Sequence, residues 1–336
     1  MRKVKEMDLS LLSFSFLAFA LTLYVILDGF DLGVGILLLF QPAKASRDHM
    51  VDSITPTWDG NETWIIMAGV TLLAAFPIAY SILLPAFYLP VIVMLLALGF
   101  RGVSFEFRVQ TKRHRRRWDV AFAVGSVVAG FMQGIIVGGL IQGVTVEDQR
   151  FAGDVLNIVR PLPIISGVTL LFGYAVLGAG WLKLKSNPSV QHFASRSLRV
   201  AAPVFAVLFG IGCIYAFNIQ PAIRLQWASH GTALSCLVGL LAVVAATLTA
   251  LTEKSSPALP FFLGLCLFVV GISGMALIVF PYIVPFSLSL WDAASSSASQ
   301  QFVLIGAVFV TPVVLAYSIF AYWIFRGRTP EKGWGE

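Results

Sequence analysis

Charged residues are scarce in this chain of 336 residues, because Asp, Glu, Lys and Arg together make up only 12% of it. A soluble globular protein carries roughly 25% charged residues. The hydrophobic share is 58% and the mean hydropathy is +0.85. These values exclude a soluble enzyme and leave no segment for a separate soluble domain. We therefore predict an all-α polytopic membrane protein in which residues 1–336 form a single integral membrane domain.

Groups that usually bind metals or form disulfides are also few. The three cysteines lie far apart inside apolar runs, which excludes a disulfide framework and a metal-type spacing. The histidines are predicted to lie in loops or at span ends: His49, His114, His192 and His230. We therefore predict no metal site and no set of haem axial ligands in this chain. Phosphate-binding loops, dinucleotide fingerprints and nucleophile elbows are absent from the sequence as well.

Long apolar runs are what the chain has in abundance. A transmembrane helix needs about 20 mostly apolar residues, and on that basis we predict nine transmembrane helices. They are expected near 9–40, 58–79, 82–104, 118–142, 161–184, 199–219, 231–252, 260–281 and 302–326. The second and third are expected to be joined tightly around Tyr80 and Ser81.

The distribution of basic residues predicts the orientation. Nine spans place the two termini on opposite sides, with six Arg and Lys on the N-terminal side and 17 on the other. The positive-inside rule then places the N-terminus outside and the C-terminus in the cytoplasm. The net charge of +6 therefore indicates membrane topology and not a nucleic-acid partner.

Two acidic residues interrupt the first apolar run. Asp28 and Asp31 are three residues apart, so they share one face of a helix. A charged aspartate at a helix centre in the membrane costs roughly 2.5–3.5 kcal/mol, and keeping one neutral at pH 7 costs about 4 kcal/mol. Because these costs nearly balance, such a group can change protonation with its surroundings. We predict a proton-handling role near the cytoplasmic boundary; permanent pairing with an arginine, or contact with interfacial water, is the structural alternative.

A second acidic group opens the next span. Asp59 and Glu62 have the spacing of an N-cap and its capping-box partner, and they also stand where a proton path would begin. Trp58 and Trp64 fit an interfacial aromatic belt. Arg101, at the end of the third span, either pairs with one of the acids or sets topology.

Small residues recur at helix-packing spacing. Gly130, Gly134 and Gly138 form one ridge, and Gly29 and Gly33 form another beside the acids. Such ridges let helix backbones approach closely, so we predict that both are packing surfaces.

Four blocks of sequence together resemble a known family. DGFDLGVG at 28–35, WDGNETW at 58–64, FRGVSFEFR at 100–108 and the segment 280–296 resemble subunit II of cytochrome bd-type ubiquinol oxidases, in the same order and over essentially the whole chain. The short chain is similar to the cyanide-insensitive branch. The resemblance implies two four-helix bundles plus one peripheral helix, in the inner membrane of a bacterium, with a periplasmic N-terminus.

The resemblance also implies a function and partners. A complex of this kind oxidises quinol, reduces O2 to water and takes protons from the cytoplasm. Haems b558, b595 and d would be ligated by subunit I, the main partner, and a small accessory transmembrane subunit, membrane lipids and a structural quinone or lipid fit as further partners. Asp59 matches a family aspartate proposed to feed protons, and Asp28 and Asp31 match the first-helix motif. Glu62 departs from the family pattern, which has a neutral residue there, so its role is not carried over.

Two other classes of function remain open from the sequence. A proton-coupled secondary transporter would use the acids as a coupling site, and it would be expected to have broken helices and polar residues at mid-membrane. A purely structural scaffold subunit would use them as helix caps.

Overall fold

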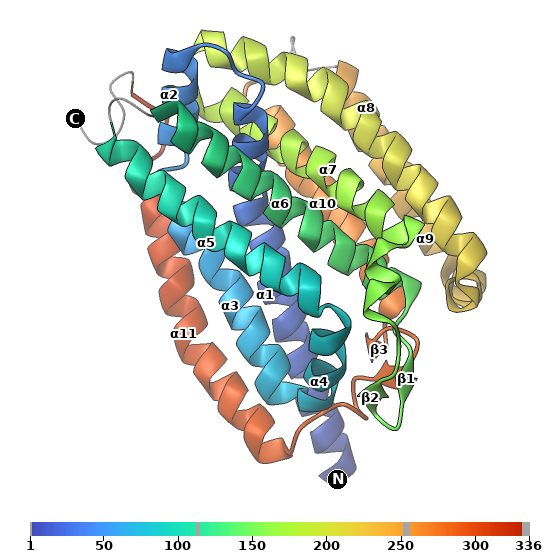
Figure 1. Cartoon of the computed structure of the whole chain (residues 1–336). Helices are drawn as coiled ribbons and strands as arrows, with labels where there is room; N and C mark the ends of the chain where they lie inside the picture. Colours follow the sequence, from blue (N-terminus) through green and yellow to red (C-terminus); the bar gives the residue numbers. More distant parts are fainter. Residues whose placement is uncertain (1, 112–114, 251–255, 331–336) are drawn as a thin grey trace.

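The computed structural model describes residues 2–111, 115–250 and 256–330. The described chain is almost entirely helical, with two small antiparallel hairpins (Figure 1). The helices are α1 (Arg2–Leu38), α2 (Lys44–Asp52), α3 (Trp58–Ala75), α4 (Pro77–Ala86), α5 (Tyr88–Gln110), α6 (Arg115–Gln142), the 3-10 helix η1 (Val155–Val159), α7 (Pro161–Lys185), α8 (Pro188–Ile219), α9 (Pro221–Ala250), α10 (Leu259–Val279) and α11 (Ser297–Ile324). The strands are β1 (Val146–Glu147), β2 (Arg150–Phe151), β3 (Tyr282–Val284) and β4 (Leu288–Ser289).

Eight helices among the described residues are long and apolar enough to cross a membrane: α1 and α5 to α11. Helix α3, which covers most of the predicted span 58–79, falls outside this set because its first turns carry Asp59, Asn61 and Glu62. It nevertheless runs alongside α1 and α11 in Figure 1. An all-helical multi-pass membrane protein is confirmed, and the count of nine spans stays a prediction.

The boundary between the second and third predicted spans was wrong. Helix α3 ends at Ala75, and the separate helix α4 begins at Pro77 and contains Tyr80 and Ser81, the predicted junction. A proline has no N–H to continue the helix and disfavours a helical backbone at the preceding residue. Phe76 accordingly has the non-helical angles φ −135° and ψ 61°. The third span then begins at Tyr88 instead of residue 82.

Helix α1 lies at the centre of the helix packing and contacts α3, α6, α7 and α11 (Figure 1). Helices α7 to α10 pack on one another, and α5 packs on α6. Helices α1 and α6 also both pack closely on α7. The buried hydrophobic residues form a large cluster around these helices and two smaller ones. The helix contacts do not by themselves divide the helices into the two four-helix bundles and peripheral helix of the prediction.

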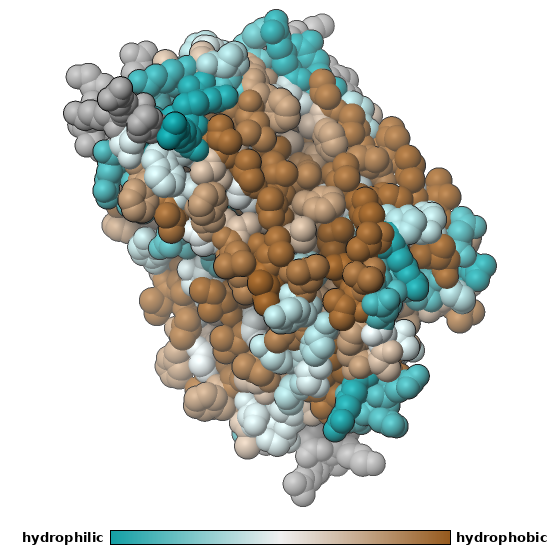
Figure 2. Space-filling model, in the orientation of Figure 1, coloured by the Kyte–Doolittle hydropathy of each residue, from teal (hydrophilic) through white to brown (hydrophobic). Residues whose placement is uncertain are grey.

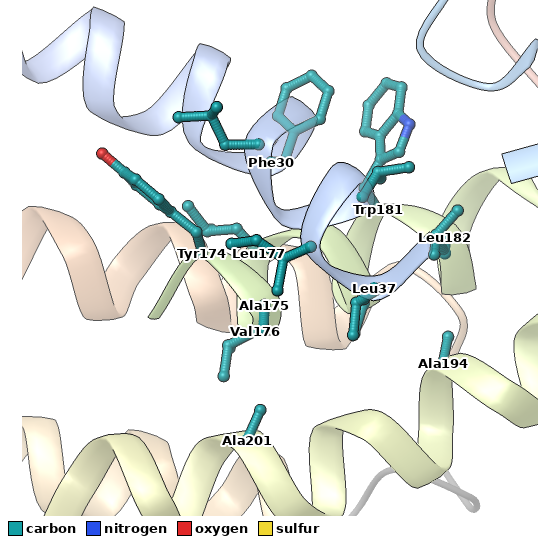
Figure 3. Close-up of a cluster of buried hydrophobic side chains, with 14 of the residues drawn as sticks. Phe30, Leu37, Tyr174, Ala175, Val176, Leu177, Trp181, Leu182, Ala194 and Ala201 are labelled. Atoms are coloured by element: carbon teal, nitrogen blue, oxygen red, sulfur yellow. The ribbon is translucent and has the colours of Figure 1, made fainter. Parts of the chain in front are cut away.

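The predicted glycine ridges are confirmed as packing surfaces. A Cβ added at Gly33 would lie 1.9 Å from the Tyr174 carbonyl oxygen, and one at Gly134 would lie 2.6 Å from Gly167 Cα. Tyr174 lies within the buried cluster that Figure 3 shows, where the rings of Phe30 and Trp181 are stacked with centroids 4.3 Å apart. Close backbone approach of α1 and α6 to α7 therefore fixes where the acids of α1 stand.

The surface has the pattern expected of a membrane protein. Hydrophobic residues cover the middle of the visible face in Figure 2, and hydrophilic residues gather toward its ends. The C-terminal ends of α1, α5, α7 and α11 lie at the same end of the molecule as α2 (Figure 1). The chain folds so that the second halves of α1 and α11 and the first turns of α3 lie together near that end, which is where the site forms.

Candidate functional site

Asp28 on α1 forms a buried ion pair with Arg101 on α5. Arg101 Nη1 donates to Asp28 Oδ1 at 2.8 Å and to Glu62 Oε1 at 3.1 Å. The Asp28 and Arg101 side chains are both 0% exposed, whereas that of Glu62 is 22% exposed. Of the two alternatives for Arg101, the structure shows pairing with an acid, and the pairing includes Glu62 as well.

Asp31 is held by an amide instead of an arginine. Asn61 Nδ2 donates to Asp31 Oδ2 at 2.7 Å, and Tyr322 Oη on α11 donates to Asn61 Oδ1 at 2.9 Å. Asp31 is 0% exposed and Asn61 1% exposed. The site is thus built from four helices that are far apart in sequence: α1, α3, α5 and α11.

Among the described residues of this site, three carboxyl groups interact with a single guanidinium group. Asp28, Asp31 and Glu62 all interact electrostatically with Arg101. Asp28 Oδ2, Asp31 Oδ1 and both Nε and Nη2 of Arg101 have no hydrogen-bond partner within the part of the chain that is described. Buried charge is costly unless it is paired. Three carboxyl groups that share one guanidinium can lower their energy by holding protons, so the arrangement is chemically suited to taking up and releasing them.

Asp59 lies at the exposed rim of the site. It is in the first turn of α3 and is exposed, one turn before Glu62. The predicted capping box is wrong, because Thr57 occupies the N-cap position and no side chain caps the helix. Glu62 pairs with Arg101 instead. Asp59 therefore lies at the surface and interacts electrostatically with Glu62, which in turn contacts the buried pair.

The two tryptophans of the motif have different positions. Trp58 is partly buried, and its ring lies 5.1 Å from that of Phe105. Trp64 is 0% exposed and packs edge-on to Phe19 at 5.8 Å. The interfacial-belt prediction is therefore wrong for Trp64, which is a core residue of α3.

A buried polar chain lies one helical turn from Asp28. Gln133 Nε2 donates to Tyr24 Oη, and Tyr174 Oη donates to Gln133 Oε1, both at 2.6 Å. These three residues come from α1, α6 and α7 and are almost fully buried. The sequence analysis missed them, because single tyrosines and glutamines in apolar helices carry no distinctive pattern.

A second ionic network was also missed. Arg47 Nε and Arg108 Nε each donate to a different oxygen of Asp119, at 2.9 and 2.6 Å, and all three residues are buried. Arg108 Nη2 also donates to Asp48 Oδ1 at 2.6 Å. The signal overlooked was Asp119, an acid that closely follows the basic run 108–117. Its pairs fasten α2 to the ends of α5 and α6.

The histidines offer no common ligand set in the described residues. The sequence-based placement of His230 at a span end was wrong, because it lies inside α9 at a kink with φ −122° and contacts Ser229. His49, on α2, accepts a hydrogen bond from the Asn187 backbone through Nε2. His114 lies outside the described residues. Among the described residues, no group of three or more His, Cys, Asp or Glu is placed to hold a metal ion.

A family model described as cytochrome bd terminal oxidase subunit II matches residues 9–325. The chain is 29% identical over 350 residues to cytochrome bd-I ubiquinol oxidase subunit 2 of Escherichia coli strain K12, with 92% of each chain covered. It is 27% identical over 324 residues to cytochrome bd ubiquinol oxidase subunit 2 of Bacillus subtilis strain 168, covering 92% of this chain and 93% of that one.

A solved structure has the same fold. The chain aligns with a chain of the bd oxidase from Geobacillus thermodenitrificans with a TM-score of 0.69 and 12% identity, covering 95% of this chain and 98% of that one. The matched segment 9–325 contains every residue of the site described above.

Proposed function

Because the chain belongs to the cytochrome bd terminal oxidase subunit II family, we propose that it acts as subunit II of a bd-type quinol oxidase in a bacterial inner membrane. In this role it supports the haem-bearing subunit I, which oxidises quinol and reduces O2 to water. It also contributes a path for protons from the cytoplasmic side. A small accessory transmembrane subunit and bound lipid complete the set of proposed partners.

The observation that carries the proton path is the shared guanidinium. Asp28 and Glu62 both accept hydrogen bonds from Arg101 Nη1, and Asp31 lies on the same helix face as Asp28. We assign Asp59 as the exposed point of uptake, Glu62 as the partly exposed intermediate, and Asp28 and Asp31 as the buried acceptors. Arg101 holds the cluster together, and its positive charge limits how many protons the three carboxyl groups keep.

Among the described residues, the histidines and cysteines do not form a pair of axial ligands for a haem. Haem in a membrane protein is usually held by His, Met or Cys axial ligands. His49 is committed to the Asn187 backbone, and the three cysteines are exposed on α8, α9 and α10. We therefore assign haems b558, b595 and d and the reacting quinol to subunit I. The proposal for this chain concerns only proton transfer and assembly, and it includes a structural quinone or lipid bound at the surface of the chain.

The two alternative functions are less well supported by the site. A transporter would need broken helices around a mid-membrane site, whereas α1 is continuous from Arg2 to Leu38 through both acids. A pure scaffold would use the acids as caps, whereas no side chain caps α3. The buried pair of Asp28 and Arg101 is compatible with scaffolding as well as proton transfer, so activity measurements must separate these two.

Replacing Asp59 with asparagine tests the proton path. We expect quinol-dependent O2 consumption and the accompanying proton uptake to fall by tenfold or more, since a positioned proton donor or acceptor typically contributes 10²–10⁴-fold. Haem content should stay normal, because Asp59 is exposed and caps no helix. The measurements are oxygen-electrode turnover, proton uptake in proteoliposomes and the optical spectrum of the purified complex.

Glu106→Gln is the matched control for this experiment. Glu106 is an exposed acid near the C-terminal end of α5, and among the described residues it forms no hydrogen bond or ion pair with the acid cluster. Its turnover should equal that of the unsubstituted complex. If Asp59→Asn and Glu106→Gln have the same full turnover, the scaffold function is favoured. Solute movement by the purified chain alone would favour a transporter.

The orientation is tested by fusion of reporters to the C-terminus. The basic residues Arg326 and Arg328 follow α11 at the end of the molecule that also carries Arg47 and Arg108. We expect a C-terminal fluorescent protein to be bright and a C-terminal alkaline phosphatase to be inactive, as the positive-inside rule requires. The opposite result would place the acid site on the periplasmic side and exclude cytoplasmic proton uptake through it.

A further inference from the structure

The amide of Asn61 connects Asp31 with the C-terminal helix. Its Nδ2 donates to Asp31 Oδ2 at 2.7 Å, while its Oδ1 accepts from Tyr322 Oη at 2.9 Å. The sequence separation between Asn61 and Tyr322 is 261 residues. An asparagine side chain has one acceptor end and one donor end. Asn61 Nδ2 also donates to the Leu27 carbonyl at 3.4 Å, so the Leu27 carbonyl and the Tyr322 hydroxyl together orient the amide with its donor end toward the carboxyl group.

The orientation of this amide matters because Asp31 has few other hydrogen-bond partners. Among the described residues, Arg101 donates its hydrogen bonds to Asp28 and Glu62. Asp31 Oδ1 has no partner among the described residues. An N–H donor stabilises the ionised carboxylate. If the amide turned over, its oxygen would face Asp31 and could bond only to the protonated acid.

The position of the Tyr322 ring does not depend on its hydroxyl group. The ring packs edge-on to Trp181 with centroids 6.1 Å apart, and Trp181 in turn stacks on Phe30. Lys185 Nζ separately donates to the Phe325 carbonyl at 2.7 Å and so anchors this end of α11. A phenylalanine at position 322 should therefore keep the ring packing and lose the hydrogen bonds of the hydroxyl group, which involve Asn61 and Thr57.

We propose that Tyr322 is a positioning residue for Asp31: its hydroxyl fixes the Asn61 amide so that a donor faces the carboxylate. The inference rests on the proposed proton path, in which Asp31 is a buried acceptor. The other charged groups that face Asp31 are Arg101 on α5, Asp28 on α1 and Glu62 on α3. Tyr322 and Asp31 interact electrostatically, but among the described residues their hydrogen-bond connection runs through Asn61.

The test is Tyr322→Phe in the intact oxidase complex. Haem content should be unchanged, and the limb of the pH–turnover profile that depends on Asp31 should move by about one pH unit to higher pH, the size expected for one hydrogen bond to a charged group. The infrared carbonyl band of the protonated Asp31, identified by its loss in Asp31→Asn, should grow at a fixed pH. This band reports on Asp31 whether or not the proton path limits turnover.

Tyr317→Phe is the matched control, because Tyr317 lies on the same helix and is 62% exposed. Asn61→Leu removes the donor to Asp31 and should produce a change in the same direction that is at least as large, and adding Tyr322→Phe to it should have no further effect, as expected for residues acting through one contact. A Tyr322→Phe infrared band and pH profile that superimpose on those of the unsubstituted complex would overturn the proposal. Loss of haem in Tyr322→Phe would assign the residue to folding and overturn it too. Failure of the proton path instead appears as full turnover in Asp59→Asn.

Discussion

Replacing Arg101 with leucine is expected to destabilise the chain by about 3–5 kcal/mol, the usual cost of removing one partner from a buried ion pair. Asp28 would be left at 0% exposure without its cation, and Glu62 would lose the same donor. The yield of intact complex after detergent extraction should fall sharply, and the remaining complex should unfold at a lower temperature. Both quantities can be measured together with haem content.

A second substitution separates the charge effect from lost packing. Arg101 also lies over the Phe122 ring at 5.6 Å, so some loss from packing is expected in any variant. Asp28→Leu combined with Arg101→Leu removes both charges, and stability should largely recover while turnover stays low. Arg196→Leu is the control, since Arg196 is exposed on α8 and forms no ion pair among the described residues. An Arg101→Leu complex as stable as Arg196→Leu would contradict the buried pair.

The acids at the centre of the site could be predicted from the sequence because carboxyl groups in a membrane-spanning helix cost free energy. Two aspartates in an apolar run are unusual whatever surrounds them, so Asp28 and Asp31 stood out at once. For Arg101 the sequence left two alternatives, a topology-setting charge or a partner of one of the acids, because the residue ends an apolar run on the same side. The structure shows the second alternative.

The neutral part of the site could not be predicted in this way. Asn61 lies inside the WDGNETW block, but an amide near a span end costs little and gives no signal. Tyr322 lies on the last helix, and its contact with Asn61 depends on how α11 packs on α3. The capping box failed for a related reason: the spacing of Asp59 and Glu62 suits a helix start, but a buried cation offered Glu62 a stronger partner than a backbone N–H.

The fold boundaries show the same limit. Apolar runs placed several spans within a few residues, because length and hydropathy decide them locally. The predicted starts of the spans 199–219 and 231–252 were wrong, because α8 begins at Pro188 and α9 at Pro221. The run from residue 65 to 100 is apolar almost throughout, so hydropathy placed its break at Tyr80 and Ser81. The backbone instead breaks at Phe76, where Pro77 interrupts the hydrogen-bond ladder. Stereochemistry there gives the better prediction of the boundary.

Gly33→Ala is expected to have an effect as large as that of Arg101→Leu, although it adds only one methyl group. The new Cβ would lie 1.9 Å from the Tyr174 carbonyl oxygen and 2.8 Å from the Gly178 nitrogen. Both are backbone atoms, so no rotamer change can relieve the overlap, and α1 and α7 must move apart. Overpacking of a core typically costs 1–3 kcal/mol, and we expect about 3 kcal/mol here, measured as a lower unfolding temperature of the complex.

The same change should also disturb the acid site, because Gly33 follows Asp31 by only two residues on α1. A shift of α1 away from α7 would move Asp28 relative to Arg101 and Asp31 relative to Asn61. Turnover of the surviving Gly33→Ala complex should therefore fall more than its haem content does. Gly306→Ala on α11 is the control, since an added Cβ there meets nothing within 4 Å and alanine favours a helix. Equal stability of the two variants would mean that α1 and α7 are not in backbone contact, and that another feature holds the acids in place.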